Sequence, residues 1–178
     1  MNIILEAKTI GLRLVNIDDS IFIYSLRNNP ILKKHISEST SDVEMQKEWI
    51  RQYKKRESMQ QEYYFIIYRK DTKEPIGTVR LYDFISNINS FCWGSWILNN
   101  NKTRYSAIES ALLVYKFAFE ELKFKQSHFD VRQDNLGVHK FHMRLGAIQT
   151  HSNDLDNFYI FKSSTYTNLL NDYSKFLS

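Results

Sequence analysis

A short strand that runs directly into a helix is encoded in residues 129–147, FDVRQDNLGVHKFHMRLGA. Alternation over 129–132 predicts the strand, the pair Asp134-Asn135 is typical of a helix start, and Gly146 predicts the helix end. One face of this helix can pack on a sheet, because its apolar residues recur at helical spacing. The segment therefore favours a fold in which strands and helices share a core, the α/β class.

The polar flank of this helix carries candidate chemistry. At about 100° of rotation per residue, Asn135, His139 and His142 point in nearly the same direction, at positions i, i+4 and i+7. The apolar residues of the helix form a separate stripe beside them. The flank therefore presents an amide and two imidazoles next to the expected sheet.

Strand and helix patterns cover the rest of the chain in a regular order. Strands are expected at 9–15, 63–69, 76–85, 91–98, 148–151 and 158–162, and helices at 18–28, 41–55, 106–122 and from 164 onward. Two helix starts carry a capping-box pattern, Ser41 with Glu44 and Ser106 with Glu109. The order is strand, two helices, three antiparallel strands, helix, strand, helix and a final hairpin. It predicts an α/β fold with a mixed sheet.

Composition narrows the class of protein. The 178 residues suggest one domain, 1–178, and the single cysteine, Cys92, excludes an internal disulfide and fits a reducing, cytoplasmic compartment. Neither a signal peptide nor a membrane span is expected. The net charge of +4 is compatible with a phosphate-bearing ligand, with nucleic acid, or with no charged partner. No metal-ligand spacing and no nucleophile elbow is present, so we expect no metal.

Several motifs occur in an order that resembles the GNAT superfamily of N-acetyltransferases, most closely its ribosomal-protein alanine acetyltransferase branch. They are Leu12-Arg13-Leu14, Arg27-Asn28-Asn29-Pro30, P-I-G-T-V-R-L at 75–81, W-G-S-W-I at 93–97, the helix at 107–122, and R-x-x-N at 132–135. The resemblance covers nearly the whole chain. It implies the GNAT fold, a single domain with a mixed, mostly antiparallel central sheet flanked by helices, and acetyl-CoA as co-substrate.

The resemblance also implies where the coenzyme binds. In the family, a glycine-rich loop at a helix N-terminus holds the pyrophosphate, because free backbone N–H groups and the helix dipole favour an anion there. The matching residues here are Lys102, Arg104, Tyr105, Ser106 and Ala107, and Tyr105 stands where the family has glycine. Lys102 and Arg104 can supply charge instead. The alternative is a solvated loop with incidental positive charges.

Other implied roles lie on the central strands and on the 135–146 helix. Trp96 and Ile97 would flank the thioester, Asn135 and His139 would contact the coenzyme, and His142 occupies the family's position for the acid that protonates the leaving thiolate. An imidazole can do this work because it titrates in a useful range. Asp83 is the candidate base, with Cys92, Glu48 or a water chain as alternatives.

Aromatic and basic residues dominate the regions expected to choose the acceptor, 25–60 and 82–92. Trp49, Tyr82, Phe84 and Trp93 are the candidate substrate contacts. This lining suits an acceptor that carries a base and phosphates, whereas a polyamine would need clustered carboxylates. We expect a small-molecule amine, favouring a nucleotide-linked amino sugar of surface-polysaccharide biosynthesis. The alternatives are a protein N-terminus or a catalytically silent ligand-binding protein. No nucleic acid or membrane partner is expected, and the chain would be a monomer or homodimer.

Overall fold

A single eight-stranded sheet forms the centre of the computed structural model, which describes residues 3–36 and 38–178. Its strand order is β1-β2-β3-β4-β5-β6-β8-β7, and every neighbouring pair is antiparallel except β5 and β6. The strands are β1 (Ile4–Glu6), β2 (Ile10–Leu14), β3 (Tyr63–Arg69), β4 (Pro75–Ile85), β5 (Ser90–Leu98), β6 (Gln126–Arg132), β7 (Ile148–Ser152) and β8 (Asp156–Lys162). The predicted mixed, mostly antiparallel sheet is confirmed.

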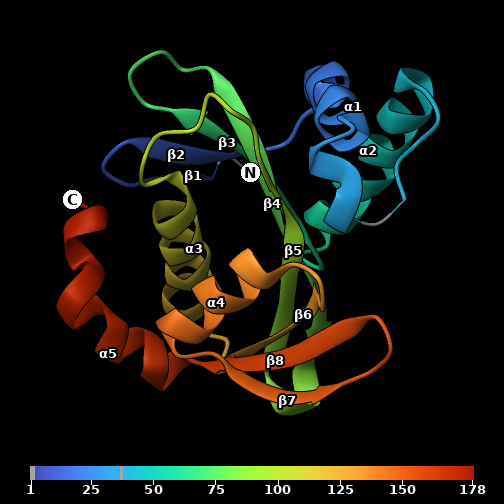
Figure 1. Cartoon of the computed structure of the whole chain (residues 1–178). Coiled ribbons are helices and arrows are strands. Elements are labelled where there is room, and N and C mark those ends of the chain that lie inside the picture. Colours follow the sequence, from blue (N-terminus) through green and yellow to red (C-terminus); the bar gives the residue numbers. More distant parts are fainter. Residues whose placement is uncertain (1–2, 37) are drawn as a thin grey trace.

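Helices cover both faces of the sheet (Figure 1). They are α1 (Ser20–Asn28), α2 (Val43–Ser58), α3 (Ser106–Lys116), α4 (Leu136–Leu145) and α5 (Ser163–Tyr173). Figure 1 shows α1 and α2 together on one side, and α3, α4 and α5 on the other. None of these helices is long and apolar enough to cross a membrane, within the described part of the chain.

Strand β3 shows how the sequence builds two cores. Its side chains alternate between the two faces of the sheet, as in any strand. Tyr64 and Ile66 pack with α1 and α2, whereas Tyr63, Phe65 and Ile67 belong to the larger core that includes α3. The continuous apolar run Tyr63–Tyr68 is therefore buried on both sides.

Both predicted capping boxes are wrong. Helix α2 begins one residue later, because Asp42 Oδ1 accepts the hydrogen bond from the Met45 backbone N–H at 2.8 Å. At α3, Ser106 Oγ accepts from the backbone N–H of Thr103 at 2.8 Å, and Glu109 turns away to the backbone of β2. Only Glu109 has been taken by a long-range partner, whereas at α2 and at Ser106 other local partners replace those of the capping box.

Three other boundaries differ from expectation. Strand β1 was not predicted, β6 begins at Gln126 rather than Phe129, and the last turn of the α3 segment, Phe117–Glu121, is a π-helix. A three-residue strand with exposed ends carries too little alternation to be detected.

Ser37 lies within the expected acceptor region and outside the described residues.

The parallel pair at the centre of the sheet separates partway along. Pairing between β5 and β6 runs from Ser90–Gln126 to Cys92–His128 and stops there, although both strands continue. Beyond that point β5 also bulges against β4, and Ser95 adopts a left-handed φ of 46°. Thr78 Oγ1 donates to the Ser95 carbonyl at 2.8 Å and fixes the bulge. The two parallel strands therefore diverge beyond Cys92 and His128.

Candidate active site

A cavity of about 210 Å³ lies where β5 and β6 separate. Both strands line it, together with residues of β4, of α1 and the segment after it, and of α4 as far as His142. Its lining residues are Arg27, His35, Ile36, Tyr82, Trp93, Gly94, Ser95, Trp96, Phe129, Asp130, Val131, Arg132, Asn135, Val138 and His142. The cavity therefore collects Tyr82, Trp93, Trp96, Asn135 and His142, five of the residues predicted for the site.

The two faces of the sheet give this cavity two different ends. Phe129 faces α4, since its ring lies 4.4 Å from the ring of His142. By strand alternation, Asp130 then faces α1 and α2. A side chain at Gly94 would also point to that face, toward the Tyr82 hydroxyl. The cavity thus joins an aromatic end beside α4 to a polar end bordered by Arg27 of α1 and by the segment after α1.

His142 is buried among aromatic rings at the α4 end. It is 4% exposed, and Trp93, Phe129 and Phe141 surround it with ring centroids 4.4–5.6 Å away. Its Nδ1 has no hydrogen-bond partner among the described residues. Burial, with a smaller contribution from His139, lowers the pKa of His142 to about 3. The expectation that His142 titrates near neutrality is therefore wrong, and the ring works as a neutral imidazole.

A second, smaller cavity of about 100 Å³ adjoins the polar end and shares Arg27 and Ser95 with the first. Its lining includes Trp49, Tyr64, Arg80, Gln46, Thr40 and Glu38. The Arg80 guanidinium lies 5.4 Å from the Trp49 ring centroid and 4.1 Å from that of Tyr82. Its Nε is 3.0 Å from Glu62 Oε1, so the guanidinium is fixed in place. Trp49 therefore lies next to the main cavity and beside the guanidinium of Arg80, which is paired with Glu62.

Asp83 belongs to a hydrogen-bonded chain outside the cavity lining. Its Oδ2 lies 2.9 Å from His128 Nε2, and His128 Nδ1 lies 2.6 Å from Ser90 Oγ. Asp83 has a left-handed φ of 50°, and its side chain is 61% exposed. Ser90 is fully buried. His128, which the sequence did not single out, thus holds the candidate base at the end of the β5–β6 pairing.

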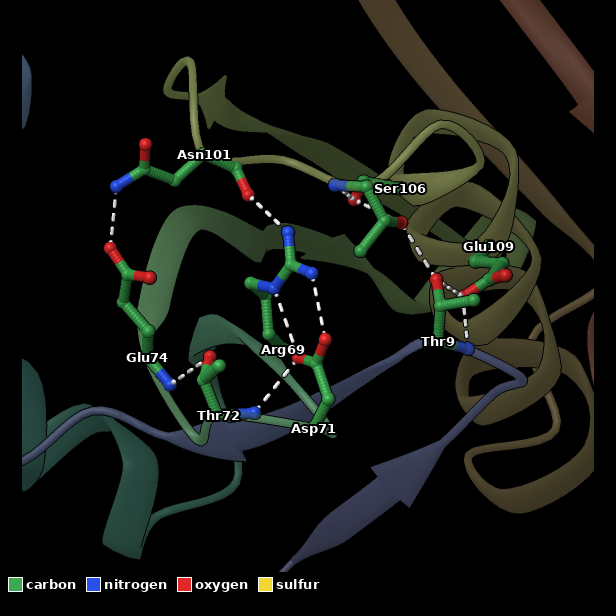
Figure 2. Close-up of polar contacts among 9 residues, drawn as sticks. Thr9, Arg69, Asp71, Thr72, Glu74, Asn101, Ser106 and Glu109 are labelled. Atoms are coloured by element: carbon green, nitrogen blue, oxygen red, sulfur yellow. Dashed lines mark hydrogen bonds and ion pairs between the residues drawn. The ribbon is translucent and has the colours of Figure 1, made fainter.

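The loop before α3 has no glycine, and side chains hold it instead (Figure 2). Arg69 Nη1 donates to the Asn101 carbonyl at 3.0 Å, and the Asn101 amide donates to Glu74 at 2.5 Å. On the other side, Thr103 Oγ1 lies 2.7 Å from Thr9 Oγ1 and 2.9 Å from Ser106 Oγ. These contacts fix the entrance to α3 without the backbone freedom that glycine provides.

The predicted pyrophosphate residues lie at this helix start and not in the cavity lining. Lys102 and Arg104 are exposed, and the Tyr105 ring packs 5.1 Å from the Phe176 ring near the C-terminus. Ala107 lies in the first turn of α3, where backbone N–H groups have no partner within the helix. The Tyr105 ring is therefore directed to Phe176, and pyrophosphate binding at this helix start remains a prediction.

The other predicted residues serve the surrounding structure. Ile97 is buried opposite Thr78, and Phe84 packs against Phe124 with ring centroids 4.9 Å apart. His139 Nδ1 is hydrogen-bonded to the Tyr159 hydroxyl. Trp96 lines the cavity and donates from Nε1 to Ser110 Oγ at 3.0 Å. Roles for these residues in binding remain predictions.

Sequence reasoning did not assign roles to four residues of the cavity with ionisable side chains, Arg27, His35, Asp130 and Arg132. Arg27 lay in a quoted motif, and His35 lay in the expected acceptor region. Asp130 and Arg132 occupy alternate positions of the predicted 129–132 strand. This spacing already indicated that their side chains lie on the same face of the sheet. His35 Nδ1 lies 3.1 Å from Asp134 Oδ1, too poorly directed for a hydrogen bond, and links the two walls of the cavity.

Cys92 ends the paired part of β5 and is 5% exposed. Burial raises the pKa of its thiol to about 12, so almost no thiolate exists at neutral pH. We expect Ellman's reagent to modify less than about a tenth of this thiol in the folded protein at pH 8, and all of it in guanidinium. Rapid modification without denaturant would show that the β5–β6 junction is open to solvent.

Comparisons with known proteins agree with this geometry. The family model described as "Acetyltransferase (GNAT) domain" matches residues 9–148. The structure of apo FdhC, a nucleotide-linked sugar GNAT, shares 53% identity over 100% of both chains, with a TM-score of 0.94. No curated protein matches the sequence.

More distant structures share the fold alone. A ribosomal-protein alanine acetyltransferase from Vibrio fischeri aligns at 14% identity, with 92% and 98% coverage and a TM-score of 0.78. The spermidine/spermine N-acetyltransferase SpeG from Vibrio cholerae aligns at 17% identity, with 89% and 96% coverage and a TM-score of 0.71. The family match spans most of the chain, and the separated central strands carry the cavity that its motifs imply. The chain belongs to the GNAT acetyltransferase family.

Proposed function

We propose that this chain transfers the acetyl group of acetyl-CoA to the primary amine of a nucleotide-linked amino sugar, in the cytoplasm. The observation that carries the proposal is the cavity between β5 and β6, which is lined by residues from both faces of the sheet. A thioester can enter from the α4 side and an amine from the α1–α2 side, so both reactants meet between the strands. Such positioning supplies a large part of the rate of a two-substrate reaction.

The charges of the polar end favour a phosphate-bearing acceptor. Arg27 lines both cavities, Arg132 lines the larger one and Arg80 the smaller, whereas Asp130 and Glu38 are the carboxylates among the lining residues. A polyamine such as spermidine would face this excess of arginine unfavourably. Arginine instead binds phosphate oxygens through paired N–H donors. The 53% identity with a nucleotide-linked sugar GNAT supports the same choice.

Aromatic residues near these arginines suit the remaining parts of the acceptor. Trp49 lines the smaller cavity, and Tyr82 and Trp93 line the larger one. We assign Trp49 to the nucleotide base, because an aromatic face beside a cation stacks well on a heteroaromatic ring. Tyr82 and Trp93 then border the sugar close to the strand gap. Phe84 would act behind Tyr82, since it packs in the core.

Acetyl-CoA, when bound, supplies an activated acetyl thioester. The site fits this group, because the strand gap leaves backbone groups unpaired and His142 Nδ1 is unpartnered beside it. Trp96 and Asn135 line the α4 end, where pantetheine would lie, with Ile97 and His139 behind them. The start of α3, with Lys102, Arg104, Tyr105, Ser106 and Ala107, would hold the pyrophosphate.

We assign His142 to the departing sulfur. A neutral imidazole can donate an N–H hydrogen bond to the developing thiolate without first being protonated. Replacing His142 with Ala is expected to lower turnover about 100-fold, with little change in coenzyme affinity. Steady-state kinetics and coenzyme titration measure the two effects separately. Unchanged turnover would remove His142 from the reaction.

The acceptor is identified by mass spectrometry of products formed from acetyl-CoA and a mixed pool of nucleotide-linked amino sugars, polyamines and peptides. The proposal expects a gain of one acetyl group on a nucleotide-linked amino sugar. Acetylation of a peptide N-terminus instead would favour a protein acceptor. Thermal stabilisation by coenzyme A without any product would favour a catalytically silent protein. The feature that supports this alternative is the absence of glycine from the loop before α3.

A further inference from the structure

We infer that Asp130 is the group that accepts the proton of the acceptor amine, an inference that rests on the proposed function. Asp130 lies in β6, two residues beyond the last β5–β6 pair, and lines the cavity from the α1–α2 side. Because amino sugars reach the enzyme largely as ammonium ions, a proton must leave before nitrogen can attack. A carboxylate at the acceptor end both attracts that ion and takes its proton.

The other titratable groups of the cavity are poorly suited to this role. Arg27 and Arg132 carry guanidinium groups, which are hydrogen-bond donors only and cannot accept a proton. Burial raises the pKa of Tyr82, so its phenol also stays protonated at neutral pH. His142 is too weak a base, with a pKa of about 3, and lies at the thioester end. The last titratable group of the lining is His35, and its ring is already engaged with Asp134 at the cavity wall.

The surroundings of Asp130 strengthen it as a base. Burial raises its pKa, the Asp156 carboxylate on β8 raises it further, and Arg132 and His128 oppose these effects more weakly. Tyr82 and Cys92 face it from the neighbouring strands, and both remain neutral at pH 7. Arg27 and His35 border the same cavity from the α1–α2 side. A carboxylate with a raised pKa holds a proton better than an ordinary one, yet releases it near neutral pH.

The proton balance of the reaction closes with this assignment. The ammonium gives one proton to an Asp130 oxygen, and the freed lone pair forms the C–N bond to the thioester carbonyl carbon. The C–S bond then breaks, and sulfur leaves with its electron pair and takes the second nitrogen proton, assisted by His142. Asp130 is exposed enough to return its proton to solvent, directly or past the Asp83–His128 pair. The sum is ammonium plus thioester giving amide, thiol and one proton.

Asp130→Asn tests the inference, because asparagine keeps the shape and removes the basic group. We expect kcat/KM for the acceptor to fall about 100-fold at pH 7, with coenzyme-induced thermal stabilisation retained. We also expect the acid limb of the wild-type pH profile of kcat/KM to disappear. In Asp156→Asn, the loss of a neighbouring negative charge should lower the pKa of Asp130 and move that limb to lower pH. Asp154→Asn, an exposed change in the β7–β8 turn, is the matched control.

Two results would overturn the assignment. One is an Asp130→Asn enzyme whose kcat/KM stays within about threefold of wild type. The other is an unchanged acid limb with a raised KM for the acceptor, which indicates binding of the ammonium without proton transfer. If the wild-type protein transferred acetyl to no amine at all, the proposed function would fail instead, and the two failures are therefore distinguishable.

Discussion

Replacing Gly94 with Leu is expected to lower acetyl transfer on the order of 1000-fold while coenzyme binding persists. A Cβ at this position would lie 3.0 Å from the Tyr82 hydroxyl, at the acceptor end of the cavity. The remaining carbons of leucine would then occupy the gap between β5 and β6, where the amine must approach the thioester. Because Gly94 has no left-handed φ, its contribution is space rather than backbone freedom.

Gly94→Ala is the graded control for this prediction. Its single methyl requires Tyr82 to move by a few tenths of an ångström. We expect a loss of less than about tenfold. Kinetics on both variants, with thermal unfolding in the presence and absence of coenzyme A, measure the contrast. Equal activity of the Leu and Ala variants would mean that the amine does not pass Gly94, and would remove the acceptor path from this gap.

Local pattern predicted the parts of this fold that depend on alternation and helical spacing. The run at 63–69 and the strand-to-helix segment at 129–147 were both located, because their faces are set by the side chains themselves. The position at which β5 and β6 separate cannot be predicted from local pattern, because it depends on which residues pair across the sheet. The family resemblance supplied the place of the coenzyme.

Properties that depend on burial could not be predicted from the sequence. His142 was placed correctly on its helix, but nothing in the pattern reveals the aromatic rings that lower its pKa to about 3. Asp130 was placed correctly on its strand, but no role was assigned to it. Its raised pKa arises from partial burial and from Asp156, which is 26 positions further along the chain and pairs with Arg132, two residues along β6 from Asp130. Long-range contacts, not local spacing, decide what these groups can do.

Glu109 is the clearest case of a residue with a long-range role, and Glu109→Ala is expected to lower the free energy of unfolding by about 3 kcal/mol. The residue is fully buried in the first turn of α3. Its Oε2 accepts from the backbone N–H and from Oγ1 of Thr9, both at 2.9 Å (Figure 2). The same oxygen also accepts from the Ile10 backbone N–H at 3.1 Å. Alanine would leave these buried donors without an acceptor and would release the start of β2 from α3.

Chemical denaturation and thermal unfolding of matched variants test this expectation. A loss of that size corresponds to a fall in Tm of about 6–12 °C for a chain of this length. Glu44→Ala is the control, because Glu44 also lies in the first turn of a helix but is exposed and forms a surface ion pair with Lys47. It should change stability by less than about 0.5 kcal/mol. Glu109→Gln keeps an acceptor oxygen and should fall between the two. Equal stability of the Glu109→Ala and Glu44→Ala variants would mean that the carboxylate does not join β2 to α3, and that local capping explains the helix start after all.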